Sequence, residues 1–438
     1  MNAILISDNK INANPTKEFF IDMLTRDIAL DRAILDLIDN SVDASRQEGK
    51  PDSWIRLTLK DDKFEIYDNC GGIDRHIAKN YAFRFGRASD SPETPNSVGQ
   101  FGVGMKRTLF KLGKKFVVES KKNNNSFRIS IDVDEWKNRE EDNWTFEIEH
   151  IDNTELNDGE TKIIVTDLYK EISNQFNLPT FANSLSNEVS SAHFKSINSG
   201  LKIYINEKLA SEYKLVILNS DEIKPYRSEI IVDDVKINII AGISERILKK
   251  GGWYIVCNGR LVESAEQTEM SGWRGDGIPQ YHADYAFFRG VVEFDCSNSS
   301  KLPWTTTKTG VDSNNPVYIA ALHHMKVAMR QIIAFLRSRA KEDQQFKSTL
   351  LESTPLNNEI ERAIKEKKFV VPSAVSTSDK FISPSPLSPL SEPKETSVQY
   401  KIPTKDMNKV KESLGVSSNS EAGKQTFYYY MEYECKNG

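Results

Sequence analysis

The stretch DLIDNSVDA (residues 36–44) lies inside a segment that has the periodicity of a helix. Apolar residues recur there at spacings of three and four: Ile34, Leu37, Ile38 and Val42. This stripe predicts one or two helices over residues 17–47 that pack on a sheet. Polar side chains at positions 36, 40 and 43 share another face of the same helix.

That polar face is a row of oxygen atoms from Asp36, Asn40 and Asp43. Carboxylate and carboxamide oxygens are the ligands that a hard cation such as Mg²⁺ prefers. A solvated helix face explains the same row equally well when the row is considered alone.

A β-hairpin is predicted next, because WIRLTL (54–59) and KFEIYD (63–68) both alternate apolar and polar residues around a short turn. The second strand ends at Asp68 and continues into NCGGI (69–73). Paired glycines such as Gly72 let a planar ligand approach the backbone closely. Asp68 has the chemistry to accept a hydrogen bond from an amino group such as that of adenine. A simple hairpin turn is the alternative.

A glycine-rich stretch, GQFGVGMK (99–106), ends a loop over residues 80–105 and enters a helix expected near 104–112. Glycines let successive N–H groups point at phosphate oxygens, and a helix N-terminus adds positive potential. Lys106 adds a charge. Further along, Gly159-Glu160-Thr161 opens a strand where the Thr161 hydroxyl has the chemistry to complete a purine contact.

Alternating segments at 115–119, 126–132, 144–149 and 162–167 predict further strands. Helices first and antiparallel hairpins after them indicate an α+β sandwich. A second β-rich region is expected over about 216–297 and a long helix over 316–341, so the domain boundaries are placed at 1–215 and 216–342. Residues 343–400 are expected to hold a helix remnant and a Ser/Pro-rich linker. Residues 401–438 are expected to form a C-terminal interaction segment, with a short helix over 404–414 and the aromatic run FYYYMEY (427–433), either a docked strand or an interaction motif.

Composition narrows the class of protein. The 438 residues carry a net charge of -5, which does not indicate a dedicated nucleic-acid binder. The four cysteines have no paired spacing for zinc or disulfides, so reduced thiols are expected. No stretch approaches the roughly 20 apolar residues of a membrane span, so we expect a cytoplasmic protein without membrane contact.

In this order and spacing, the four motifs resemble those of the GHKL ATPases (gyrase, chaperone, histidine kinase, MutL) with their Bergerat fold. The resemblance covers about residues 15–215 and is nearest to bacterial MORC-like and chaperone-like members. It implies that ATP and Mg²⁺ bind, with Asn40 as the metal ligand and Asp68 as the adenine contact. It also implies an ATP lid at about 82–106. The other binding residues that we predict are Asp43, Gly72, Ile73, Gly99, Gln100, Phe101, Gly102, Val103, Gly104, Lys106 and Thr161.

Two catalytic residues follow from the resemblance. Hydrolysing members usually have a Glu four residues before the Asn as general base, and this chain has the shorter Asp36 there, so slow turnover is expected. The second region resembles a transducer domain, in which a loop lysine reaches the γ-phosphate. Lys308 in LPWTTTKTG (302–310) is the candidate.

The sequence therefore predicts a Mg-dependent ATPase that works as a clamp, dimerises with nucleotide and acts on a protein or DNA client. A protein partner is expected at the aromatic C-terminal segment. One alternative is a nucleotide-gated binding module with negligible turnover. Another is a histidine kinase, which the positions of His323 and His324 near the C-terminal end of the second region disfavour.

Overall fold

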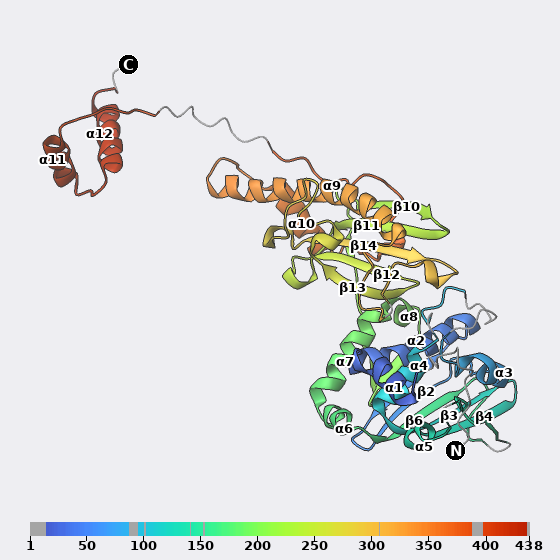
Figure 1. Cartoon of the computed structure of the whole chain (residues 1–438). Coiled ribbons are helices and arrows are strands. Elements are labelled where there is room, and N and C mark those ends of the chain that lie inside the picture. Colours follow the sequence, from blue (N-terminus) through green and yellow to red (C-terminus); the bar gives the residue numbers. More distant parts are fainter. Residues whose placement is uncertain are drawn as a thin grey trace, which may run out of the picture. The chain divides into compact units, whose positions relative to one another are not determined.

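The computed structural model describes residues 15–86, 95–99, 102–140, 142–151, 154–305, 307–387 and 397–435 (Figure 1). The chain separates into two units, Met1–Leu387 and Ser388–Gly438. The larger unit contains two large sheets, one of eight strands and one of five, each with its own hydrophobic core.

The predicted N-terminal helices are confirmed as α1 (Lys17–Arg26) and α2 (Leu30–Glu48). The apolar stripe of α2 is completely buried at Ile34, Ile38 and Val42. The helix ends at Gly49, which has φ 57° and donates its N–H to the carbonyl of Ser45. Glycine adopts this left-handed conformation without the steric cost of a Cβ, so the sequence itself stops the helix there.

The first sheet has the order β5-β4-β3-β6-β2-β1-β7-β8 and is antiparallel except where β1 pairs with β7. Its strands are β1 (Trp54–Leu59), β2 (Lys63–Asp68), β3 (Gly113–Lys122), β4 (Asn125–Asp132), β5 (Glu149–His150), β6 (Thr161–Leu168), β7 (Lys202–Ile205) and β8 (Lys208–Leu209). The predicted β1–β2 hairpin is confirmed. The strand expected over 144–149 is wrong for most of its length, because only residues 149 and 150 pair with β4.

Further helices accompany this sheet: α3 (Arg75–Ile77), a π-helical turn (Ala78–Ala82), α4 (Gly104–Leu112), α5 (Val133–Lys137), α6 (Lys170–Phe176), α7 (Pro179–Ala192) and α8 (Phe194–Asn198). Helix α4 lies against α2, and the Thr108 hydroxyl donates to the carbonyl of Ala33 at 2.6 Å. This packing brings the glycine-rich stretch to the polar face of α2.

The second sheet has the order β10-β11-β14-β12-β13. Its strands are β10 (Tyr226–Val232), β11 (Val235–Ile243), β12 (Gly252–Cys257), β13 (Arg260–Glu266) and β14 (Phe288–Asp295). The long helix α9 (Pro316–Lys347) packs on β10, β11 and β14 (Figure 1). Asn315 caps its first turn, and Pro316 occupies the first helical position, where proline is well tolerated.

The end of α9 forms the expected helix remnant at residues 343–347, but much of the following stretch is packed rather than a linker. Helix α10 (Pro355–Lys365) buries Leu356, Ile360 and Ala363 in the second core. Strand β15 (Phe369–Val370) pairs with β9 (Ile217–Leu218). The apolar residues within this polar stretch find partners only after the chain folds back on the second sheet.

The smaller unit contains α11 (Thr404–Leu414), with the bounds that the sequence predicted, and α12 (Asn419–Tyr433). The aromatic run 427–433 is helical rather than a strand. Its large side chains are exposed, for example Tyr428 at 68%. Across the described residues, no helix is both long and apolar enough to cross a membrane.

Candidate functional site

Asp36 lies on α2 and is 5% exposed. Its Oδ1 accepts a hydrogen bond from Lys308 Nζ at 3.2 Å, and its Oδ2 pairs with the guanidinium of Arg107 on α4. A Cβ added at Gly104 would lie 3.2 Å from the Asp36 carboxyl carbon. The glycine at the start of α4 therefore lets this helix begin directly beside the carboxylate. The structure thus brings together the two residues predicted as catalytic, and it adds Arg107, which the sequence analysis missed.

Asp39, one turn further along α2, is completely buried. Its Oδ2 accepts from Lys308 Nζ at 2.6 Å, and its Oδ1 accepts from Arg260 Nε at 2.9 Å. His193 Nε2 lies 3.2 Å from the same Oδ1. The sequence analysis did not select Asp39, and its position in DLIDN was the available signal, since it lies three residues from Asp36.

The residues around Asp39 shift one another's pKa values. Burial alone would raise the pKa of Asp39, but Lys308, Arg260 and His193 hold it well below the ordinary value. Burial alone would lower the pKa of Lys308, and the carboxylates of Asp39 and Asp36 raise it instead. Burial lowers the pKa of His193 to about 4, so its ring is neutral near pH 7. The group is therefore ionic, apart from a neutral histidine.

Asp43, the third polar residue of the row, binds the backbone of the predicted lid. Its carboxylate accepts from the N–H of Val98 at 2.8 and 2.9 Å and from that of Gly99 at 2.8 Å. Burial raises the pKa of Asp43 to about 6, and these backbone hydrogen bonds oppose the shift. Val98 packs in the second core, and Ser97 O accepts from Asn258 Nδ2 at 3.2 Å. Residues 95–99 thus connect α2 to the second sheet.

Asp68 ends β2 and is 7% exposed. It accepts hydrogen bonds from Ser41 Oγ at 2.8 Å and from the N–H of Cys70 at 2.9 Å. Burial raises the pKa of Asp68 to about 6, with both hydrogen bonds opposing the shift. Because its partners are neutral, this carboxylate lacks the ionic stabilisation that Asp39 has.

The residues around Asp68 belong to β3 and β6. Thr161 is opposite Asp68 in the β2–β6 register, and its hydroxyl lies 2.8 Å from that of Ser120. Ser120 Oγ also accepts from the N–H of Ile73 at 2.7 Å. A Cβ at Gly72 would lie 2.3 Å from the carbonyl oxygen of Lys121, so only glycine fits this turn. The predicted base contacts Asp68, Gly72 and Thr161 therefore lie in one small region, together with the predicted binding residue Ile73.

The predicted lid is described only in part. Gln100 and Phe101 lie outside the described residues. Gly102 has φ 64°, and Val103 precedes the first turn of α4, which has no side-chain cap. Lys106 is 2% exposed and donates to the carbonyls of Ala82 at 2.9 Å and Arg84 at 2.6 Å. Burial lowers its pKa to about 7. In this conformation Lys106 holds the beginning of the lid, and its approach to phosphate stays a prediction.

Asn40 is exposed beside these groups, and a Cβ at Gly99 would lie 3.0 Å from its Oδ1. Among the residues that the structure describes, no three His, Cys, Asp or Glu side chains gather as metal ligands. A Mg²⁺ ion that arrives with a nucleotide needs no such protein cage, since it keeps waters and phosphate oxygens. One accessible amide oxygen suits that mode of binding.

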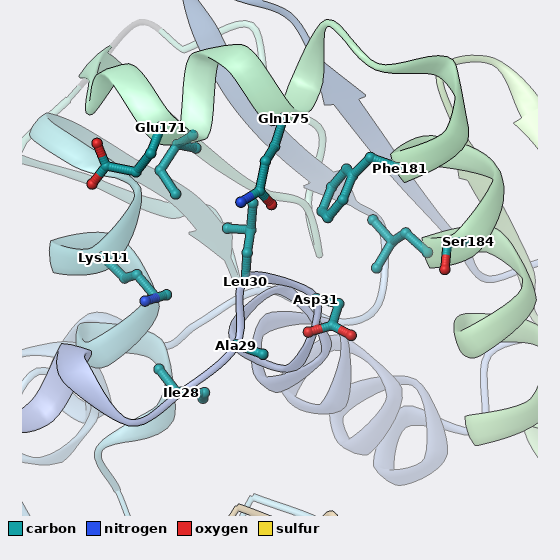
Figure 2. A pocket seen from close by; sticks show the side chains of 11 residues that line it. Ile28, Ala29, Leu30, Asp31, Lys111, Glu171, Gln175, Phe181 and Ser184 are labelled. Atoms are coloured by element: carbon teal, nitrogen blue, oxygen red, sulfur yellow. The ribbon is translucent and has the colours of Figure 1, made fainter.

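A separate cavity of about 460 Å³ lies at the opposite end of α2. The start of α2, the end of α4 and helices α6 and α7 line it (Figure 2). Lys111 and Glu171 stand on one side of it and the ring of Phe181 on another (Figure 2). None of the predicted site residues lines this cavity.

Residues 28–162 match the family of histidine kinase-, DNA gyrase B- and HSP90-like ATPases. The matched segment spans less than half of the chain and contains every site residue predicted from the sequence except Lys308. This segment is therefore similar to a GHKL-type ATPase domain, in agreement with the mixed α+β fold. No curated protein matches the chain.

Proposed function

We propose that residues 28–162, together with Lys308, form an ATP-binding site that hydrolyses ATP slowly. The observation that carries this proposal is the contact between Asp36 and Lys308. Asp36, the candidate base, lies in the segment that resembles an ATPase. Lys308, which contacts it, lies 272 residues further along the chain, after the last strand of the second sheet.

At the base end of this site, ionised Asp68 would accept a hydrogen bond from the adenine amino group. Ser41 and the Cys70 N–H orient its carboxylate. Gly72 and Thr161 would allow the close approach of the base and complete the contact. The neutral surroundings of Asp68 suit a neutral donor better than a cationic one.

At the phosphate end lies the first turn of α4, whose N–H groups have no side-chain cap among the described residues. A helix N-terminus attracts anions through these groups and its dipole. Gly102 and Gly104 leave room for the phosphates, and Asn40 would hold a nucleotide-bound Mg²⁺, which neutralises phosphate charge. Lys308 would reach the γ-phosphate.

Hydrolysis would use Asp36 as general base. A water oxygen forms a bond to the γ-phosphorus, the bond from that phosphorus to the β,γ-bridging oxygen breaks, and ADP leaves. Asp36 takes the proton of the attacking water. Both of its oxygens are in ion pairs in the structure, and each oxygen keeps a further lone pair that can accept from the attacking water.

Beyond the site, we propose a cytoplasmic, nucleotide-dependent homodimer that acts as a clamp, nearest to MORC-like and chaperone-like proteins, with the second sheet as its transducer domain. The exposed aromatic residues of α12 favour a protein partner over DNA.

A nucleotide-gated module with negligible turnover is the second candidate. It is favoured by the ion pairs that occupy Asp36 and by the short side chain of this residue. Both candidates require that ATP binds.

Steady-state phosphate release from Mg-ATP, measured on the wild type and on Asp36→Asn, separates these candidates. We expect slow release that falls by about 10²-fold or more in the variant, the loss typical of removing a general base. ATP binding, measured by calorimetry, should persist in the variant. Equal release from both proteins would reject Asp36 as the base, and binding without release by the wild type would favour the gated module.

A further inference from the structure

Asp39 is a buried carboxylate for which the proposed hydrolysis has no role. It projects from α2, the helix that carries Asp36 and Asn40, yet both of its cationic partners come from other elements. Arg260 begins β13, and Lys308 lies on the loop before α9. Asp39 therefore connects the first domain to the second through two cations.

The ion pairs around Asp36 and Asp39 involve more cations than carboxylates. Three cationic side chains (Lys308, Arg260 and Arg107) face the carboxylates of Asp36 and Asp39, which leaves one positive charge in excess. Each carboxylate has a guanidinium of its own, Arg107 for Asp36 and Arg260 for Asp39. Lys308 is shared between both carboxylates. Lys308 can therefore move away while each buried carboxylate keeps one cationic partner. A buried carboxylate without any cationic partner would be costly.

Backbone contacts hold the loop on both sides of Lys308. The N–H of Lys308 donates to the carbonyl of Thr305, and that of Thr305 donates to the carbonyl of Gly310. Trp304 and Val311 form a β-bridge that closes the loop. Lys308 itself has φ 53°, a left-handed conformation that few non-glycine residues adopt. The loop thus holds the lysine backbone next to α2, and a flexible side chain links it to the carboxylates.

We propose that Asp39 is a positioning residue that holds Lys308 in the nucleotide-free protein and competes for it with the γ-phosphate. This inference rests on the proposed function, because it requires that ATP binds beside Asp36. Asp39 then determines how strongly the site prefers a triphosphate over a diphosphate. When Lys308 turns to the γ-phosphate, Asp39 keeps Arg260, and one of the links between the two domains is released.

The test compares the affinities for Mg-ADP and for the non-hydrolysable analogue Mg-AMP-PNP by calorimetry in four proteins: wild type, Asp39→Asn, Lys308→Met and the double variant. In Asp39→Asn we expect AMP-PNP to bind about tenfold more tightly, the effect of removing one competing charge-assisted hydrogen bond. The affinity for ADP should stay unchanged, because ADP has no γ-phosphate. The double variant should behave like Lys308→Met.

A purely structural role for Asp39 would change both nucleotides alike. The inference would be overturned if Asp39→Asn changed the affinities for AMP-PNP and ADP equally, or if it left the ratio of the two affinities unchanged. It would also be overturned if Asp39→Asn still changed the affinity for AMP-PNP in the Lys308→Met background. Each of these outcomes leaves ATP binding intact. A wild-type protein that binds neither nucleotide would overturn the proposed function as well.

Asp39→Asn leaves Arg260 buried without its anion, which threatens folding. The charge-balanced variant Asp39→Asn with Arg260→Gln removes both partners and avoids that problem. It should show the same gain for AMP-PNP alone. Hydrogen exchange on the nucleotide-free proteins gives a second readout, since the 302–311 loop should exchange faster in either variant than in the wild type.

Discussion

Asp39 on α2 and Asp68 at the end of β2 are two buried carboxylates, and their surroundings shift their pKa values in opposite directions. Asp39 faces Lys308 and Arg260, and its pKa lies well below the ordinary value despite burial. Asp68 has a hydroxyl and a backbone N–H as partners, and burial raises its pKa to about 6. Burial is similar in the two cases, so the charge of the partners decides the direction. The ionic end of the site suits phosphates and the neutral end suits a base.

The largest expected effect comes from removing each carboxylate in turn. Asp39→Asn should lower the free energy of unfolding by about 3–5 kcal/mol, because it strands buried cations. Asp68→Asn should leave it unchanged or raise it by up to about 3 kcal/mol at pH 7, because a neutral amide avoids the desolvation cost of the buried charge. Urea unfolding followed by circular dichroism measures both. Similar losses of unfolding free energy in Asp39→Asn and Asp68→Asn would contradict the proposed difference between the ionic and the neutral end of the site.

The next effect is the pH dependence of stability. Because the folded pKa of Asp68 (about 6) exceeds its ordinary value of 3.8, its contribution to stability is fully present below pH 3.8 and is lost as the pH rises through 6. The total change is about 3 kcal/mol. Asp39 has the opposite sign, since its contribution is present above pH 3.8 and is lost only in stronger acid.

Unfolding of wild type and Asp68→Asn between pH 4 and 7 isolates this effect. The wild type should lose stability relative to the variant as the pH rises, and the contribution of Asp43 cancels in the difference. Asp62→Asn, at an exposed residue of the β1–β2 turn, provides the control. A constant difference between wild type and Asp68→Asn over this range would show that Asp68 titrates normally.

The smallest effect concerns Ser41, whose hydroxyl lowers the pKa of Asp68. Ser41→Ala should cost about 1 kcal/mol of stability. It should also raise the pH at which nucleotide binding is half lost, since binding requires ionised Asp68. Calorimetric titrations with Mg-ADP from pH 5 to 8 measure this midpoint, with the exposed Ser130→Ala as control. A midpoint that is lower or unchanged would mean that Ser41 does not stabilise the ionised form.

Local patterns predicted much of the fold. Spacing of apolar residues gave α1, α2 and α9, and alternation gave the β1–β2 hairpin, because each pattern reflects one buried face of one element. Prediction was poorer at residues 144–149 and 343–387. Whether those segments pair or pack depends on neighbours that are distant in sequence.

The sequence by itself determined which residues share the polar face of α2, where β2 ends at Asp68, and where glycines open the backbone. These are properties of helix and strand geometry over a few residues. Only the tertiary structure decided the charge environment of each carboxylate. The cations around Asp39 lie 221 and 269 residues further along the chain, and electrostatic pairing follows distance in space rather than in sequence.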